Sequence, residues 1–187
     1  MIRGSKKSKG PIRSLNRSAV RDDKSPAVVR KAKAPNDPSI CERCGAIYER
    51  KTWRGDRKVT AQLSRAAEWT VCPACEQVSR QEGQGRLMLL GSGVPARSDL
   101  IRRRMDNVAK RATVTQPQRR IISVDELGPT GDEGIEVLTT SQKLAHRIVH
   151  ELRKVLGGSA IYSWQDDGTL YAEWRYELPK STAKKRR

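Results

Sequence analysis

Phenylalanine is absent from this chain of 187 residues, and the other large aromatic residues are scarce, with four Trp and four Tyr. Hydrophobic residues make up 36% of the sequence and charged residues 32%. This supply of apolar side chains is too small to fill a core along the whole chain, so we expect part of it to stay unpacked.

Long hydrophobic runs are also missing. No stretch reaches the roughly 18 apolar residues that a membrane-spanning helix requires. The basic start MIRGSKKSKGPIRS is not followed by the apolar segment of a secretory signal. These absences predict a cytoplasmic protein with no membrane partner. In that reducing compartment, paired cysteines are more often metal ligands or redox groups than disulfides.

Residues typical of catalysis are few. The two histidines, His146 and His150, are four positions apart on a predicted helix, but the residues between them, RIV, lack the glutamate of a His-Glu-x-x-His site. We interpret both as exposed polar residues. Asp166 and Asp167 belong to a predicted turn, and we find no Ser-His-Asp arrangement and no phosphate-binding loop. The sequence therefore favours a non-enzymatic protein without a small-molecule substrate.

Acidic residues are too few to balance the basic ones. The chain has 38 Lys and Arg but 21 Asp and Glu, which gives a net charge of +17. The excess positive charge is concentrated in residues 1–40, 97–120 and 180–187, whereas residues 121–179 carry a net charge of −5. A segment with excess positive charge can be only a solvated surface or tail, but basic segments with few acidic residues typically neutralise the phosphates of nucleic acids. We predict nucleic-acid contacts at Lys6, Lys7, Lys9, Arg13, Arg17, Arg30, Lys31, Lys33, Arg102, Arg103, Arg104, Lys110 and Arg111.

The chain has only four cysteines, arranged as two Cys-x-x-Cys pairs: Cys41 with Cys44, and Cys72 with Cys75. Zn²⁺ prefers four tetrahedral ligands, and two such pairs complete a Cys₄ site. Gly45 permits the positive φ that the first turn often needs. We therefore predict one structural Zn²⁺ per chain. An iron–sulfur cluster could use the same thiolates, and the CPAC pair alone resembles a thiol redox site.

Hydrophobic periodicity and composition divide the chain into five segments and indicate an α+β fold class. We predict a short helix between the cysteine pairs, a strand at GRLMLLG, and a basic helix that is capped by Ser98 and ends before Pro117. The segments are a disordered basic tail (1–39), a Cys₄ zinc-ribbon-like domain (40–95), a basic helix with a linker (96–118), a small α+β domain (119–178) and a second disordered basic tail (179–187).

The segment 119–178 has the pattern of a ββαββ sheet covered by one helix. Its helix, TTSQKLAHRIVHELRKVLGG, has capping-box spacing between Thr139 and Gln142, and a tight Asp-Gly turn is expected in the final hairpin. Alternation predicts that Trp164 and Trp174 are mostly buried. Because this segment is acidic, we expect it to be a scaffold or a surface for a protein partner rather than for nucleic acid.

The order of these motifs resembles a family of small bacterial proteins over about residues 40–176. The shared elements are Cys-x-x-Cys, a tryptophan (Trp53), Cys-Pro-x-Cys, GRLMLLG, Pro-x-x-Arg-Ile at 117–121, Thr-Thr-x-x-x-Leu-Ala-x-x-Ile at 139–148, and Trp174. That family in turn is similar to the N-terminal part of nonsense-mediated-decay protein three, which binds the large ribosomal subunit through zinc-binding Cys-x-x-Cys pairs. This chain has two such pairs where that adaptor has more.

The resemblance implies association with RNA or the ribosome. Together with the charge pattern, it leads to the expectation of a non-enzymatic zinc-binding protein that associates with ribosomal RNA or ribosomal particles. A DNA-binding or transcription-associated zinc protein and a thiol redox protein using CPAC are the alternatives.

Overall fold

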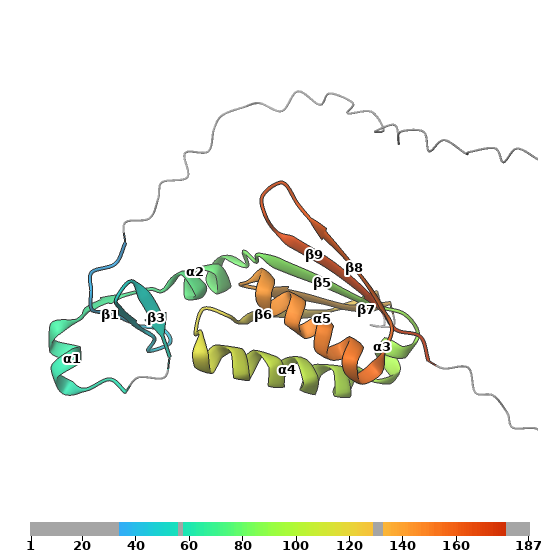
Figure 1. Ribbon diagram of the computed structural model, residues 1–187, viewed down its shortest axis with the longest axis horizontal. Helices are drawn as coiled ribbons and strands as arrows, with labels where there is room; N and C mark the ends of the chain where they lie inside the picture. Colours follow the sequence, from blue (N-terminus) through green and yellow to red (C-terminus); the bar gives the residue numbers. More distant parts are fainter. Residues whose placement is uncertain (1–33, 56–57, 129–132, 179–187) are drawn as a thin grey trace, which may run out of the picture. The chain divides into compact units, whose positions relative to one another are not determined.

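The computed structural model describes residues 34–55, 58–128 and 133–178, which form a mixed α and β structure with two sheets. The predicted tails fall almost entirely outside the described residues. The elements in chain order are β1 (Ser39–Cys41), β2 (Ile47–Glu49), β3 (Thr52–Arg54), α1 (Ala61–Ala66), β4 (Glu68–Thr70), α2 (Pro73–Arg80), β5 (Gly85–Leu90), α3 (Gly93–Ala96), α4 (Ser98–Thr115), β6 (Ile121–Leu127), β7 (Gly134–Thr139), α5 (Gln142–Leu156), β8 (Ser159–Trp164) and β9 (Leu170–Arg175) (Figure 1).

The first sheet has the strand order β3-β2-β1-β4. Strands β1, β2 and β3 form an antiparallel meander, whereas β4 pairs with β1 in parallel, with Cys41 opposite Thr70. The predicted helix between the cysteine pairs is present as α1, but it buries no residue, and Val59 lies before it and is exposed. Helix α1 therefore does not present a face to a core.

The second sheet has five strands in the order β6-β7-β5-β9-β8. Strand β5, which we had assigned to the cysteine domain, lies at its centre, antiparallel to β7 and parallel to β9. The predicted four-stranded ββαββ sheet and the boundary at residue 95 are thus corrected. The physical reason is that alternate residues of β5, including Leu87 and Leu89, are buried in the core that α4 and α5 share, while its backbone pairs with a strand on each side.

Helix α5 packs on β5, β7, β8 and β9, and α4 packs against α5 (Figure 1). Both helices contribute to one core that also contains Leu87, Leu89 and Trp174. Gly85 permits the close approach of α5, because a Cβ atom there would lie 2.6 Å from the Cβ of Ala145. The basic helix predicted as a separate segment is therefore part of the packed α+β domain.

The ends of the helices differ in detail from the predictions. Ser141, not Thr139, caps α5, and its side chain accepts a hydrogen bond from the N–H of Leu144. Thr139 is instead buried and donates to the carbonyl of Gly85 at 3.1 Å. Arg97 precedes α4, so Ser98 is its first residue rather than its cap.

The two tryptophans of the β8–β9 hairpin have opposite environments. Trp174 is fully buried, as predicted, and its indole N–H donates to the carbonyl of Gly157 at 3.0 Å. Trp164 is 63% exposed, and the prediction that it belongs to the core is wrong. Trp164 pairs with Leu170 at the far end of the hairpin, and the turn that follows spans Gln165 to Thr169 rather than only Asp-Gly.

Candidate metal centre and basic surface

The parallel pairing of β1 and β4 brings the two cysteine pairs together. Cys41 ends β1, and the chain then turns back so that the N–H of Gly45 donates to the carbonyl of Cys41 at 2.8 Å, with Gly45 at φ 70° as predicted. The long spacer forms β2, β3 and α1 and returns along β1 as β4. Cys72 follows β4 directly, and Cys75 lies in the first turn of α2.

The four sulfur atoms form one cluster. All lie within 4.8 Å of one another, with Sγ–Sγ distances of 3.8 Å between Cys41 and Cys75 and 3.7 Å between Cys44 and Cys72. Four Zn–S bonds of about 2.3 Å in a tetrahedron require Sγ–Sγ distances of about 3.8 Å. A disulfide would need about 2.05 Å, and all four cysteines are free. The cluster therefore has the spacing of a tetrahedral metal site.

The cysteine thiols of the cluster differ in the direction of their pKa shifts. Burial raises the pKa of Cys41, but the backbone N–H groups of Cys72, Arg43 and Cys44 outweigh burial and lower the pKa from 9.0 to about 7. The N–H of Cys72 lies 3.3 Å from the Cys41 sulfur. Burial raises the pKa of Cys72 and of Cys75. A cation would compete with the protons on these buried thiols and would replace the solvation they have lost.

Arg120, which the sequence analysis did not assign to the metal site, links the cluster to the five-stranded sheet. Its Nη1 lies 3.5 Å from the Cys75 sulfur, and its Nε donates to the carbonyl of Pro117 at 2.7 Å. Burial opposes the charge of Arg120, but the neighbouring sulfur atoms of Cys44, Cys75 and Cys72 outweigh burial and raise the pKa of Arg120 above its ordinary value.

Two further hydrogen bonds hold the backbone at this link. The N–H of Arg120 donates to the hydroxyl of Thr140 at 2.8 Å, and that hydroxyl donates to the carbonyl of Gln118 at 2.6 Å. The sequence signal for this link was present in Pro-x-x-Arg-Ile and Thr-Thr, two motifs that were noted without a role.

The five residues of α4 that were predicted to contact nucleic acid lie on one helix, but they differ in exposure and in ion pairing. Arg103, Lys110 and Arg111 are exposed. Arg102 forms an ion pair of 2.8 Å with Glu126, and Arg104 lies 3.9 Å from Glu151. The other predicted contacts, Lys6, Lys7, Lys9, Arg13, Arg17, Arg30, Lys31 and Lys33, lie outside the described residues.

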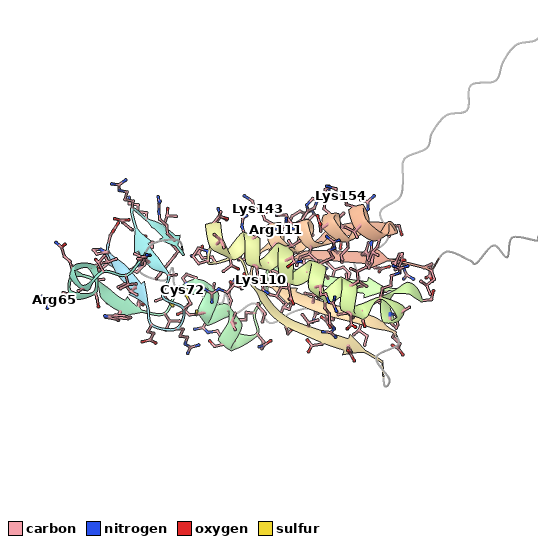
Figure 2. All side chains as sticks on the ribbon, turned by 90° about the horizontal axis from the view of Figure 1, so that it is seen from below. Arg65, Cys72, Lys110, Arg111, Lys143 and Lys154 are labelled. Atoms are coloured by element: carbon pink, nitrogen blue, oxygen red, sulfur yellow. The ribbon has the colours of Figure 1, made fainter. Side chains whose placement is uncertain are left out.

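The exposed face of α5 forms a second basic surface that the sequence analysis missed. Four of the five Lys and Arg residues between positions 121 and 179 lie on α5, and its single acidic residue is Glu151. Figure 2 shows Lys143 and Lys154 at the two ends of α5 and Lys110 and Arg111 on α4. Averaging charge over residues 121–179 concealed this surface, because the acids are mainly on strands and loops. The helical spacing of Lys143, Arg147 and Lys154 was the available signal.

Comparison with protein-family models and with curated protein sequences finds no match to this chain. The resemblance to the ribosome-binding adaptor therefore stays a prediction, and the site must be interpreted from its own geometry. Within the described part of the chain, no helix has both the length and the hydropathy needed to cross a bilayer.

Proposed function

We propose that this chain is a non-enzymatic protein in which one Zn²⁺ stabilises the cysteine region and which associates with RNA, with ribosomal RNA or ribosomal particles as the expected target. The observation that carries the metal assignment is the single cluster of Cys41, Cys44, Cys72 and Cys75. Four thiolates leave no open coordination position, and a structural role is typical of such a zinc site.

Burial favours a metal site over a thiol redox pair. Reactive cysteines are partly exposed thiolates with a lowered pKa, whereas Cys72 is fully buried and its pKa is raised by that burial. Cys72 also belongs to the same cluster as the other three cysteines rather than forming a pair with Cys75 alone.

Charge supports the association with RNA. The net charge of +17 is concentrated in a few segments, and the exposed Lys and Arg of α4 and α5 add folded surfaces of the same sign. Cations held on a folded surface contact phosphates and release counterions, so binding should weaken steeply with salt.

Metal analysis tests the first half of the proposal. Protein purified without added metal should contain one Zn²⁺ per chain, measured by elemental analysis, and Cys72→Ser should lose it. Finding iron, or no metal in folded protein, would contradict the zinc assignment.

RNA binding tests the second half. We expect the full chain to sediment with ribosomal particles in a sucrose gradient and to bind structured RNA more tightly than a DNA duplex of equal length. Deleting residues 2–33 should flatten the dependence of log K on log salt, because it removes many cationic groups. Tighter binding to the DNA duplex would favour the DNA-binding alternative instead.

A further inference from the structure

A cleft with aromatic and cationic walls lies between the start of α5 and the far end of the β8–β9 hairpin. Its volume is about 400 Å³, and its lining includes Arg119, Lys143, His146, Arg147 and Trp164. The cleft is of the size that small ligands occupy in proteins. Its walls combine a large exposed aromatic ring with positive charge, and none of the residues that line it is acidic.

Trp164 is exposed because the hairpin extends beyond the helix that covers the sheet. Tyr162, two residues earlier on β8, lies under α5 and packs on the core, with its ring 5.1 Å from that of His146. Trp164 continues the same side of the strand, but α5 begins at Gln142 and leaves the indole 63% exposed. A large aromatic residue in this position forms a surface on which a flat ligand can stack.

The hairpin end is fixed rather than free. The side-chain amide of Gln142 donates to the carbonyl of Gly168, and the N–H of Thr169 donates to the carboxylate of Asp167 at 2.8 Å. The first bond joins the turn to the start of α5, and the second lies within the turn, so both order the end of the hairpin that carries Trp164. Asp166 and Asp167 lie in this turn, but neither lines the cleft.

The cations around the indole are available for a ligand. Arg119, Lys143 and Arg147 pair with none of the carboxylates in the described part of the chain. Lys143 and Arg147 are one helical turn apart on the exposed face of α5. Arg119 approaches from the segment that leads into β6, one residue before the arginine that contacts Cys75. Three cations and one exposed ring line the same cleft, and this combination matches a base flanked by phosphates.

We propose, building on the association with RNA proposed above, that Trp164 stacks on one unpaired nucleotide of an RNA strand while Arg119, Lys143 and Arg147 contact the flanking phosphates. An aromatic ring surrounded by cations is the general arrangement by which proteins hold single-stranded nucleic acid. Bases in a continuous duplex are stacked on each other and cannot reach the indole, so this site selects an unpaired position in a loop, bulge or end.

Fluorescence anisotropy with the full, metal-loaded chain tests the site. The probes are fluorescein-labelled decauridylate and a labelled RNA duplex of the same length, at salt high enough to weaken contacts made by charge alone. We expect Trp164→Ala to bind decauridylate about ten-fold more weakly and to bind the duplex as the unchanged chain does. Trp164→Phe should keep most of the affinity, because its ring still stacks.

The matched control is Trp69→Ala, since Trp69 is also exposed, at 53%, but lies on β4 of the other sheet. Trp69→Ala should leave decauridylate binding unchanged. If the unchanged chain binds both probes and Trp164→Ala weakens neither, or weakens both equally, the stacking site is wrong while RNA association stands. If the unchanged chain binds neither probe even at low salt, the RNA association itself fails. Displacement of decauridylate by polyglutamate as effectively as by unlabelled RNA would overturn the assignment to a nucleotide and favour an acidic peptide.

Discussion

The region around the five-stranded sheet buries 18 residues in one apolar cluster, whereas the cluster beside the four-stranded sheet has seven buried residues, three of which are cysteines. The first region includes α4 and α5, which together place nine buried side chains in its core. The second has strands of three residues and a helix α1 that buries nothing. Apolar burial stabilises the first region, whereas the second has few buried apolar side chains and a cluster of cysteines that could hold a metal ion.

This difference gives a physical reason for proposing a metal ion in the cysteine region. Small domains bury too little surface to offset the loss of chain entropy, and a metal ion is a common substitute for a core. The cysteine region illustrates this, since Cys41 and Cys72 occupy the centre of its buried cluster, where a larger domain would have apolar side chains. Tyr48 and Trp53, with ring centroids 5.3 Å apart, add aromatic packing to this cluster.

Metal removal should unfold one region and leave the other folded. Structural zinc contributes on the order of 10 kcal/mol to folding of small domains, so chelation or Cys72→Ser should unfold residues 39–82 while the five-stranded sheet stays folded. Amide hydrogen exchange measured by mass spectrometry should show lost protection in β1–β4 and retained protection in β5, β7 and β9.

Returning Zn²⁺ to the chelated chain is the control, because it should restore protection in the unchanged protein but not in Cys72→Ser. Simultaneous loss of protection in both sheets would show that the two regions unfold as one unit, and the comparison would fail.

The two tryptophans of the β8–β9 hairpin should differ in their contribution to the stability of the apolar region. Trp174→Ala empties a fully buried site and removes the partner of the Gly157 carbonyl, so it should lower the free energy of unfolding by about 3–5 kcal/mol. Trp164→Ala, at an exposed position, should change it by less than about 0.5 kcal/mol. Denaturant unfolding of the metal-loaded variants measures both, and equal losses would contradict the opposite environments of the two residues.

The sequence predicted the two kinds of stabilisation unequally well. The cysteine cluster could be predicted because Cys-x-x-Cys pairs dictate local geometry, and the strands β6 to β9 and helix α5 could be predicted from strong periodicity. The central place of β5 could not, because an apolar run of six residues does not specify its neighbours, and its partners β7 and β9 come much later in the chain. Arg120 was missed for a similar reason, since its contact with Cys75 joins residues 45 positions apart.

Trp164 shows a different limit. Alternation along β8 correctly placed it on the side of the sheet that faces α5, but burial depends on where the covering helix begins. Helix α5 begins at Gln142, and Trp164 extends past that point. Periodicity predicts the side of a strand on which a residue lies, whereas the length of the covering element decides whether the residue is buried.

Arg120 tests whether the two regions act on each other through the metal site. Arg120→Gln removes the charged N–H groups near the Cys75 sulfur, and loss of such partners of metal ligands typically costs 10-fold or more in metal affinity. We expect about a 10-fold loss for Arg120→Gln, measured by competition with a chelator. Arg65→Gln, in the exposed last turn of α1, is the control and should leave metal affinity unchanged. An unchanged affinity in Arg120→Gln would mean that the link is only structural.

The smallest expected effect concerns the cap of α5, which belongs to the apolar region alone. The hydroxyl of Ser141 accepts a hydrogen bond from the N–H of Leu144 at 3.3 Å, and that N–H is one of the donors that a helix start leaves unpaired. Ser141→Ala should therefore lower the free energy of unfolding of the five-stranded region by about 1 kcal/mol.

Because Ser141 is not a metal ligand and lies in the region held by apolar burial, the same variant should leave metal affinity unchanged. Ser163→Ala, at an exposed position on β8, is the matched control and should change the free energy of unfolding by less than about 0.5 kcal/mol. Denaturant unfolding and chelator competition on the two variants separate these effects. A Ser141→Ala variant that lost metal as well as stability would show that α5 also positions the cysteine region, through the hydrogen bonds between Thr140 and Arg120. The two regions would then be less independent than their cores indicate.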